Sequence, residues 1–252
     1  MNKQFVVVLG PAGSGKTTLT ASFGKWVEEN QGFEVGYVNL DPGAEDLPYE
    51  PDFDVRSIVR VRDVMREYGL GPNGAFIRSA DLMVERLNDV IGGVASVEAD
   101  YVIVDTPGQM ELFVFRDSGP GIISRLRGLG FPMAVVVFDP SLARRPVDVA
   151  ALKLMTTVVQ LRLEVDSIPV LNKADLPGSE DIAKVLEDPE ALMEALRSEK
   201  GVAADLAQSI MAVLGEYRQA TRLVRVSALT GEGMEELYDV LHEVYCTCGD
   251  LT

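Results

Sequence analysis

One segment of eight residues near the start of this 252-residue chain constrains its fold more than any other feature. It spans residues 10–17, reads G-P-A-G-S-G-K-T and directly follows the apolar run F-V-V-V-L at 5–9. This fits the phosphate-binding pattern G-x-x-x-x-G-K-[ST], which lies between a strand and a helix. Glycines let successive backbone N–H groups turn toward phosphate oxygens, and the next helix adds its positive dipole end. The sequence therefore predicts a strand–loop–helix unit that binds a nucleoside triphosphate.

Two side chains of this segment carry specific roles. Lys16 can reach the β- and γ-phosphates, which also gives it a catalytic role, and the Thr17 hydroxyl can ligate Mg²⁺. A flexible glycine-rich turn would explain the glycines, but not their place between a strand and a helix. We assign nucleotide binding to Gly10, Pro11, Ala12, Gly13, Ser14, Gly15, Lys16, Thr17 and Thr18.

Composition limits the expected partners and compartment. The formal net charge is -16, so we expect no direct nucleic-acid partner and no binding to an anionic membrane. The two cysteines, Cys246 and Cys248, are too close for a disulfide framework, which favours a reducing compartment. No secretory signal is visible, and no apolar run approaches the roughly 20 residues that span a bilayer. These features predict a cytoplasmic protein.

Short runs rich in Val and Ile alternate with helical stretches, as in α/β proteins with a buried parallel sheet. We expect strands at residues 4–9, 34–40, 101–105, 133–138, 167–171 and 223–226. We expect helices at residues 16–29, 57–68, 80–88, 147–163 and 233–245. Insertions at about 42–98 and about 178–221 interrupt the alternation, and the second is helical. The pattern predicts a single α/β domain over residues 1–252, with a mostly parallel sheet and helices on both faces.

A second motif reads D-T-P-G-Q and begins at Asp105, the last residue of an expected strand. An acid at this position lies where ligands bind in open α/β sheets. Asp105 can hold Mg²⁺ directly or through water, together with Thr17. The Gly108 N–H can bind the γ-phosphate and so sense its presence, and Gln109 and Glu111 follow where a side chain could orient water. A D-x-P-G turn is common by itself, so this assignment depends on the phosphate loop before it.

A third set of motifs selects the base. In the N-K-x-D pattern, the Asp175 carboxylate can accept hydrogen bonds from the N1–H and amino group of guanine, which adenine could not supply. Asn172 and the stem of Lys173 would brace this loop and cover the ring. An S-A-L run after the last expected strand can offer a backbone N–H to guanine O6. These residues are Ser227, Ala228 and Leu229.

The order of these motifs resembles that of phosphate-loop GTPases. Asp41 ends the strand that follows the phosphate-loop helix, where Ras-like proteins carry a Thr-bearing loop. This position resembles the dimerising, SIMIBI-type branch of P-loop NTPases, which includes signal-recognition and metal-insertion GTPases. The alternative explanation for Asp41 is an acid that caps a turn before a proline.

The long first insertion contains Gly71, Pro72 and Asn73, a turn-forming cluster when taken alone. Together with N-L-D-P-G at 39–43 and D-T-P-G-Q-M-E at 105–111, this tripeptide resembles the GPN-loop GTPases, which are named for it. The resemblance covers nearly the whole chain, and the ending Y-C-T-C-G-D-L at 245–251 resembles archaeal members. Gly43 departs from the pattern, because many relatives have Ala there.

The resemblance implies a homodimer in which the GPN loop of one subunit reaches the nucleotide site of the other, so that Asn73 acts in trans. Asp41, Gln109 and Glu111 would then orient the attacking water, with Mg²⁺ as cofactor, GTP as substrate and GDP as product. It implies hydrolysis without a separate activating protein. Eukaryotic relatives are implicated in the assembly of RNA polymerase II, so protein clients such as polymerase subunits are expected.

Other functions remain open at this point. A metal-insertion GTPase of the nickel-chaperone kind would need His-rich or Cys-His ligands near the switch loops, which the sequence lacks. His242, Cys246 and Cys248 could form a soft metal site, but with one His in the chain and no fourth ligand nearby a packed helix end is the preferred explanation. A small-molecule kinase and a non-hydrolysing binding module share the phosphate loop, but the guanine-selecting motifs argue against the kinase.

Overall fold

The computed structural model describes residues 3–216 and 222–249. Within these residues one sheet has seven strands in the order β3-β2-β4-β1-β5-β6-β7, and each neighbouring pair is parallel. The strands are β1 (Lys3–Leu9), β2 (Val35–Asn39), β3 (Phe53–Asp54), β4 (Tyr101–Asp105), β5 (Gly130–Phe138), β6 (Ser167–Leu171) and β7 (Val224–Arg225). The predicted α/β class with a parallel sheet is confirmed.

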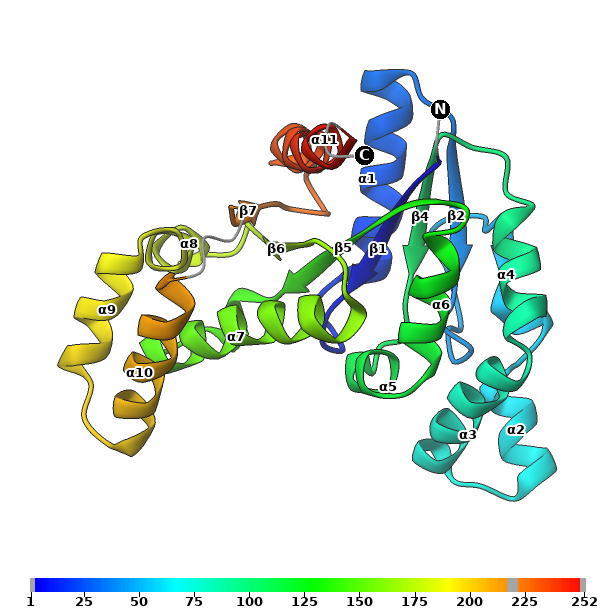
Figure 1. The fold of residues 1–252 in the computed structure, drawn as a ribbon, viewed down its shortest axis with the longest axis horizontal. Coiled ribbons are helices and arrows are strands. Elements are labelled where there is room, and N and C mark those ends of the chain that lie inside the picture. Colours follow the sequence, from blue (N-terminus) through cyan, green and yellow to red (C-terminus); the bar gives the residue numbers. More distant parts are fainter. Residues whose placement is uncertain (1–2, 217–221, 250–252) are drawn as a thin grey trace.

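Helices cover both faces of this sheet (Figure 1). They are α1 (Lys16–Gln31), α2 (Val61–Tyr68), α3 (Pro72–Glu85), α4 (Leu87–Ala95), α5 (Met110–Phe115), α6 (Ser118–Leu126), α7 (Pro146–Leu163), α8 (Ser179–Glu187), α9 (Pro189–Ser198), α10 (Val202–Glu216) and α11 (Met234–Gly249). Two short 3-10 helices are η1 (Val55–Ser57) and η2 (Pro140–Leu142). None of the helices in the described residues is both long and apolar enough to cross a membrane.

Alternate residues of β1 supply the two halves of the core. Phe5, Val7 and Leu9 face the larger cluster, which contains apolar side chains from α2 to α7 and from α9 and α10. Val6 and Val8 face the smaller cluster, which contains side chains of α1 and α11. Full burial of such a side chain contributes roughly 1.5–3 kcal/mol. The strand is therefore buried on both faces, as its continuous apolar run predicts.

The strand register brings the loops that carry the motifs to one edge of the sheet. Val8 and Asn39 both pair with Asp105, and Phe138 pairs with Leu171. Since all pairs are parallel, the segments that follow β1, β2, β4, β5 and β6 leave the sheet at the same end. Ligand sites of open α/β sheets lie at this end.

The first insertion differs from its expected structure in three places. The helix expected at 57–68 begins only at Val61, because Asp54 accepts the Arg56 N–H at 2.8 Å and caps η1 instead. The helix expected at 80–88 is two helices, α3 and α4, which meet at Arg86, where the backbone leaves the helical region with ψ 26°. The two-residue strand β3, which was not predicted, pairs with the end of β2.

The second insertion is helical, as predicted, and contains α8, α9 and α10. Pro189 at the first turn of α9 and the Asp188 carboxylate, which accepts two backbone N–H groups, explain why a new helix begins there. The last residues of the expected insertion, 217–221, lie outside the described residues.

Candidate functional site

The phosphate loop joins β1 to α1, as predicted. Gly15 has φ 90° and ends the loop at the N-cap of α1, where a Cβ would lie 2.4 Å from Asn172 Nδ2. Lys16 Nζ donates to the carbonyl oxygens of Gly10 at 2.8 Å and Pro11 at 3.0 Å. Burial lowers the pKa of Lys16, although the charges of nearby carboxylates oppose the shift. The Ser14 hydroxyl is buried inside the loop with no hydrogen-bond partner.

Asp105 ends β4 and is 1% exposed. Burial raises its pKa to about 6, although hydrogen bonds from the Thr17 and Tyr49 hydroxyls oppose the shift. Its Oδ2 accepts the Tyr49 hydroxyl at 3.1 Å, whereas its Oδ1 is buried with no partner. A buried carboxylate oxygen without a partner is costly, and a bound cation would satisfy it. The predicted Mg²⁺ ligands, Thr17 and Asp105, therefore fit a magnesium ion, whose preferred ligands are oxygens.

Asp41 follows β2 and contacts the D-T-P-G loop, whose Gly108 N–H we predicted to sense the γ-phosphate. Its Oδ1 accepts the Gly43 N–H at 2.8 Å, and its Oδ2 accepts the Gly108 N–H at 3.2 Å. The amide that we expected to bind the γ-phosphate thus binds a carboxylate of the same chain. Burial raises the pKa of Asp41, and the hydrogen bonds and the Lys16 charge only partly offset this.

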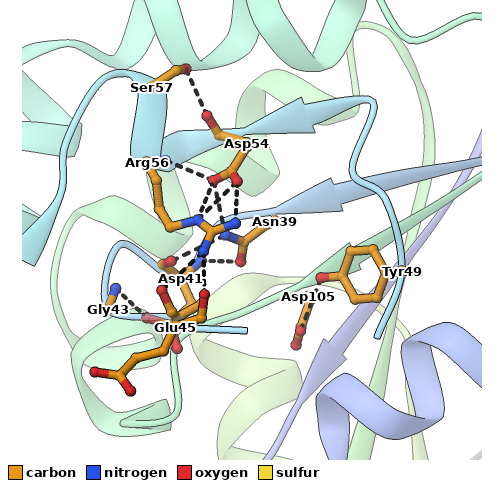
Figure 2. A network of polar contacts seen from close by, with 10 residues as sticks. Asn39, Asp41, Gly43, Glu45, Tyr49, Asp54, Arg56, Ser57 and Asp105 are labelled. Atoms are coloured by element: carbon orange, nitrogen blue, oxygen red, sulfur yellow. Dashed lines mark hydrogen bonds and ion pairs between the residues drawn. The ribbon is translucent and has the colours of Figure 1, made fainter. Parts of the chain in front are cut away.

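A network of side chains that we did not predict holds the Asp41 segment (Figure 2). Arg56 donates to both carboxylate oxygens of Asp54 and, through Nη1, to the carbonyl oxygens of Ala44 at 3.1 Å and Glu45 at 2.9 Å. Asn39 Nδ2 donates to Asp54 at 3.0 Å. These hydrogen bonds of the first insertion therefore hold residues 41–45 in place. Asp54 and Arg56 belong to the two-residue strand β3 and the short helix η1, where periodicity gives no signal, and Asn39 ends β2.

Gln109 and Glu111 follow this site at the start of α5. Gln109 is the half-buried N-cap residue, and Glu111 is exposed in the first turn. The Glu111 charge is one of three that oppose the lowered pKa of Lys16, so Glu111 acts on the phosphate-loop lysine. The structure thus brings both predicted water-orienting residues to the same edge of the sheet as Asp41.

The base-selecting motifs are joined to the phosphate loop through Asn172. Its Nδ2 donates to Ser14 O at 2.9 Å, and its Oδ1 accepts the Ala228 N–H at 3.0 Å. Ser227 Oγ donates to Asp175 Oδ1 at 2.6 Å. We predicted that Asn172 braces this region, and the contacts agree. Asp175 itself is exposed, so its burial would have to come from a bound base.

Asp139 is a site residue that the sequence analysis missed. It follows β5 and forms an ion pair with Lys173, whose Nζ also donates to Gly13 O at 2.9 Å. Lys173 has the left-handed value φ 60°, which is uncommon for a side chain other than Gly, Asn or Asp. Asp139 stands at the end of a buried strand like Asp41 and Asp105, and this signal could have identified it.

The GPN tripeptide begins a helix and is not an extended loop. Gly71 is the N-cap of α3, Pro72 is its first residue, and Gly71, Pro72 and Asn73 are all exposed. Figure 1 shows the α2–α3 pair projecting beyond the sheet at the lower right. Asp81 of α3 pairs with Arg116, which follows α5, at 2.9 Å. The helix that carries the tripeptide is therefore tied to the segment after the D-T-P-G motif.

An apolar seam adds a second connection between α3 and the loops that carry Pro42 and Pro107. It encloses only about 10 Å³ and is lined by Pro42, Phe76, Ala80, Met83, Pro107, Leu112, Phe113 and Ser118. Pro42 O also accepts the Val61 N–H at 2.9 Å, which ties the same loop to the start of α2.

The suspected soft metal site near the end of the chain is only partly described. Cys246 Sγ lies 3.5 Å from His242 Nε2, and the Cys246 thiol is free and exposed. The side chain of Cys248 lies outside the described residues. Within the described part of the chain, no group of three or more His, Cys, Asp and Glu residues could hold a metal ion.

Comparison with known proteins identifies relatives over nearly the whole chain. A family model described as "Conserved hypothetical ATP binding protein" matches residues 8–247. A GPN-loop GTPase of Pyrococcus abyssi is 40% identical over 252 residues, which cover 98% of this chain and 99% of that protein. GPN-loop GTPase 1 of Dictyostelium discoideum is 33% identical over 93% of this chain, which spans 59% of that longer protein. The crystal structure of a GTPase in apo form from Pyrococcus abyssi matches with a TM-score of 0.88 at 39% identity, covering 97% of this chain and 98% of that one.

Proposed function

This chain belongs to the GPN-loop GTPase family, and on that premise we propose that it hydrolyses GTP to GDP and phosphate as a homodimeric, nucleotide-dependent switch. In this reaction a water oxygen attacks the γ-phosphorus while the bond to the β–γ bridging oxygen breaks. Phosphoryl transfer of this kind depends mostly on positioning and on electrostatic stabilisation of charge. Mg²⁺, held by Thr17 and Asp105, would supply positive charge at the phosphates.

The observation that carries the proposal is the double contact of Asn172 with the phosphate loop and the S-A-L loop. It supports one continuous site in which the phosphates lie at Lys16 and a guanine lies between Asp175 and Ala228. The alternative of adenine binding would leave the Asp175 carboxylate without the paired N–H donors that guanine offers.

The contact between Asp41 and Gly108 supports the switch. A γ-phosphate bound to the Gly108 N–H would replace the Asp41 Oδ2 that accepts it in this structure. Asp41 would then be free to orient the attacking water, together with Gln109 and Glu111. The Asp41 segment also contacts α2 and α3 through Pro42, so its movement would reach the GPN tripeptide.

Hydrolysis is tested by multiple-turnover release of phosphate from GTP. We expect the wild-type chain to turn over GTP with Mg²⁺ and the Lys16→Ala variant to lose turnover. We expect ATP to be a poor substrate. Binding of GTP without turnover by the wild-type chain would identify a non-hydrolysing module and refute the proposal.

A homodimer is supported by exposed apolar side chains beside the GPN tripeptide. Ile77 lies one helical turn after Asn73 on α3, and Ile77, Val84 and Phe115 are exposed although they are large and apolar. Such side chains commonly mark protein interfaces when they cluster. In a two-fold dimer the same patch occurs on both subunits, so each GPN tripeptide could reach the partner's site.

Mixing two inactive variants tests whether Asn73 acts in trans. In a dimer of one Asn73→Ala and one Lys16→Ala subunit, one site has both an intact phosphate loop and an intact Asn73 from its partner. Random mixing would restore roughly a quarter of the wild-type rate, since half of the dimers are mixed and each has one working site. No recovery beyond the Asn73→Ala rate would mean that Asn73 acts within its own chain.

We further propose that the switch acts in the cytoplasm, in the assembly of RNA polymerase or another protein complex. The free Cys246 thiol supports a reducing compartment, and the resemblance to eukaryotic GPN-loop GTPases supports the assembly role. Affinity capture from the source cell, with nucleotide-locked protein as bait, would enrich polymerase subunits over the Lys16→Ala control. Capture without polymerase subunits would contradict the polymerase role.

A further inference from the structure

Tyr49 reaches the expected metal ligand from a segment of the first insertion that no nucleotide motif includes. It lies eight residues after Asp41, and its hydroxyl points toward Asp105 (Figure 2). Tyr49 Oη donates to Asp105 Oδ2 at 3.1 Å across a separation of 56 residues. Burial and the nearby Asp105 charge raise the pKa of Tyr49 above its ordinary range, so the hydroxyl remains a donor.

The ring of Tyr49 is held in place by packing. It stacks on Tyr37 of β2 with ring centroids 5.2 Å apart and an angle of 23° between the planes. Tyr37 in turn packs closely over Gly24 of α1, where a Cβ would lie only 2.4 Å from its hydroxyl oxygen. The chain after Tyr49 is fixed as well, because Asp52 exchanges two hydrogen bonds of 2.8 Å with the Tyr37 backbone.

The two oxygens of Asp105 are therefore in different situations. Oδ2 is occupied by Tyr49, whereas Oδ1 is buried and has no partner. A carboxylate with one oxygen fixed in this way cannot rotate freely, so the second oxygen keeps one direction. Partners of metal ligands that orient them in this manner strengthen metal binding, and their loss typically weakens it about 10- to 100-fold.

We propose that Tyr49 is a positioning residue that orients the Asp105 carboxylate for the magnesium ion of the nucleotide complex. This inference rests on the proposed function, because it requires that Asp105 binds the metal. It assigns a part in nucleotide-dependent metal binding to the segment between Asp41 and β3, which the sequence motifs leave without a role.

The test compares metal affinity with nucleotide affinity in the Tyr49→Phe variant. This change removes only the hydroxyl and keeps the ring stacked on Tyr37. Mn²⁺ serves as the probe, and its binding to the GDP complex of the full chain is measured by electron paramagnetic resonance. GDP affinity is measured separately in excess EDTA. The matched control is Tyr37→Phe, which removes the hydroxyl of the neighbouring ring and leaves the bond to Asp105 intact.

We expect Tyr49→Phe to bind Mn²⁺ about 10-fold more weakly, with unchanged GDP affinity in EDTA, and Tyr37→Phe to match the wild type. In an Asp105→Asn background the effect of Tyr49→Phe should vanish. Unchanged Mn²⁺ binding would overturn the inference. Tighter Mn²⁺ binding would also overturn the inference, because the hydroxyl would then compete with the metal. An equal loss of GDP affinity in EDTA would overturn it as well. If the wild-type chain bound no guanine nucleotide at all, the proposed function itself would fail.

Discussion

Asp175 is the residue on which the proposed choice of guanine depends. Its Oδ1 accepts the Ser227 hydroxyl at 2.6 Å, and an asparagine could keep this contact through its amide oxygen. The amide nitrogen, however, would face the guanine amino group as a second donor. A hydrogen bond to a charged group contributes roughly 1.5–3 kcal/mol, so the loss of this bond predicts an about 10- to 100-fold weaker GDP complex for Asp175→Asn. Xanthosine diphosphate carries a carbonyl group in place of the guanine amino group, so its affinity for the Asp175→Asn variant should rise.

Competition with a fluorescent nucleotide measures both affinities for Asp175→Asn. Circular dichroism of the free variant controls for folding. A variant that kept the wild-type preference for GDP over xanthosine diphosphate would show that Asp175 does not read the base.

Asp139 is the residue of this region that we expect to contribute to stability in acid. Burial favours the neutral form, but the Lys173 ion pair and hydrogen bonds from Ser141 outweigh it and hold the pKa of Asp139 below its ordinary value of 3.8. A carboxylate with a lowered pKa stabilises the fold above its unfolded pKa, and this stability is lost as the pH falls through the lower, folded value. We therefore expect the free energy of unfolding to depend less on pH below pH 3.8 in Asp139→Asn than in the wild type.

At neutral pH the same substitution should cost about 1–3 kcal/mol, because the Lys173 charge loses its partner. Urea unfolding at several pH values measures both effects. Asp148→Asn is a control at the start of α7, where the half-buried Asp148 accepts the Arg145 N–H. Parallel pH profiles for Asp139→Asn and the wild type would refute the assignment.

Among the elements, the contact between the Asp41 segment and α3 links the nucleotide site to the GPN helix. A Cβ on Gly43 would lie 2.4 Å from a ring carbon of Phe76, so an alanine cannot fit here unless the ring moves. We expect Gly43→Ala to destabilise the chain by about 1–3 kcal/mol, as overpacking does. In a Phe76→Ala background the same change should cost little.

The double-mutant cycle over these two positions gives the interaction energy directly. Gly32→Ala cannot serve as the control for this cycle, because Gly32 has φ 70°, a backbone conformation that strains any side chain. Gly92 has no atom within reach of its Cβ, so Gly92→Ala is the matched control. An equal cost of Gly43→Ala with and without the Phe76 ring would mean that the seam does not couple these elements.

The elements show where sequence reasoning succeeds and where it stops. Six strands were predicted because each lies in a short run rich in apolar residues, including β7, whose two residues lie within the run at 223–226. β3 was missed because Phe53 and Asp54 follow Pro51 and Asp52 instead of lying in an apolar run, and the break at Arg86 was missed because no glycine or proline marks it. In the site, the motifs located the loops that meet at one edge of the sheet, where Asn172 joins the phosphate loop to Ala228. Tyr49 and Arg56 lie outside the motifs, and only the folded chain brings Tyr49 to Asp105 and Arg56 to the carbonyl oxygen of Ala44.

The whole molecule carries a net charge of -16, and its ligand is also an anion. Carboxylates of Asp41, Asp105 and Glu111 surround Lys16, so the approach of a nucleotide is opposed by like charges near the site and over the surface. Salt screens this repulsion, because the Debye length falls from about 30 Å at 0.01 M to about 8 Å at 0.15 M ionic strength. The association rate constant for GDP should therefore rise with salt, by roughly two- to tenfold over this range.

Stopped-flow fluorescence with a labelled GDP measures this rate constant. Guanosine, which lacks phosphates, is the matched ligand, and its association should be nearly independent of salt, since no long-range repulsion acts on it. A GDP rate constant that fell with salt would mean that the field at the site attracts the nucleotide despite the acidic surface. The local positive charge of Lys16 and Lys173 would then outweigh the charge of the whole molecule.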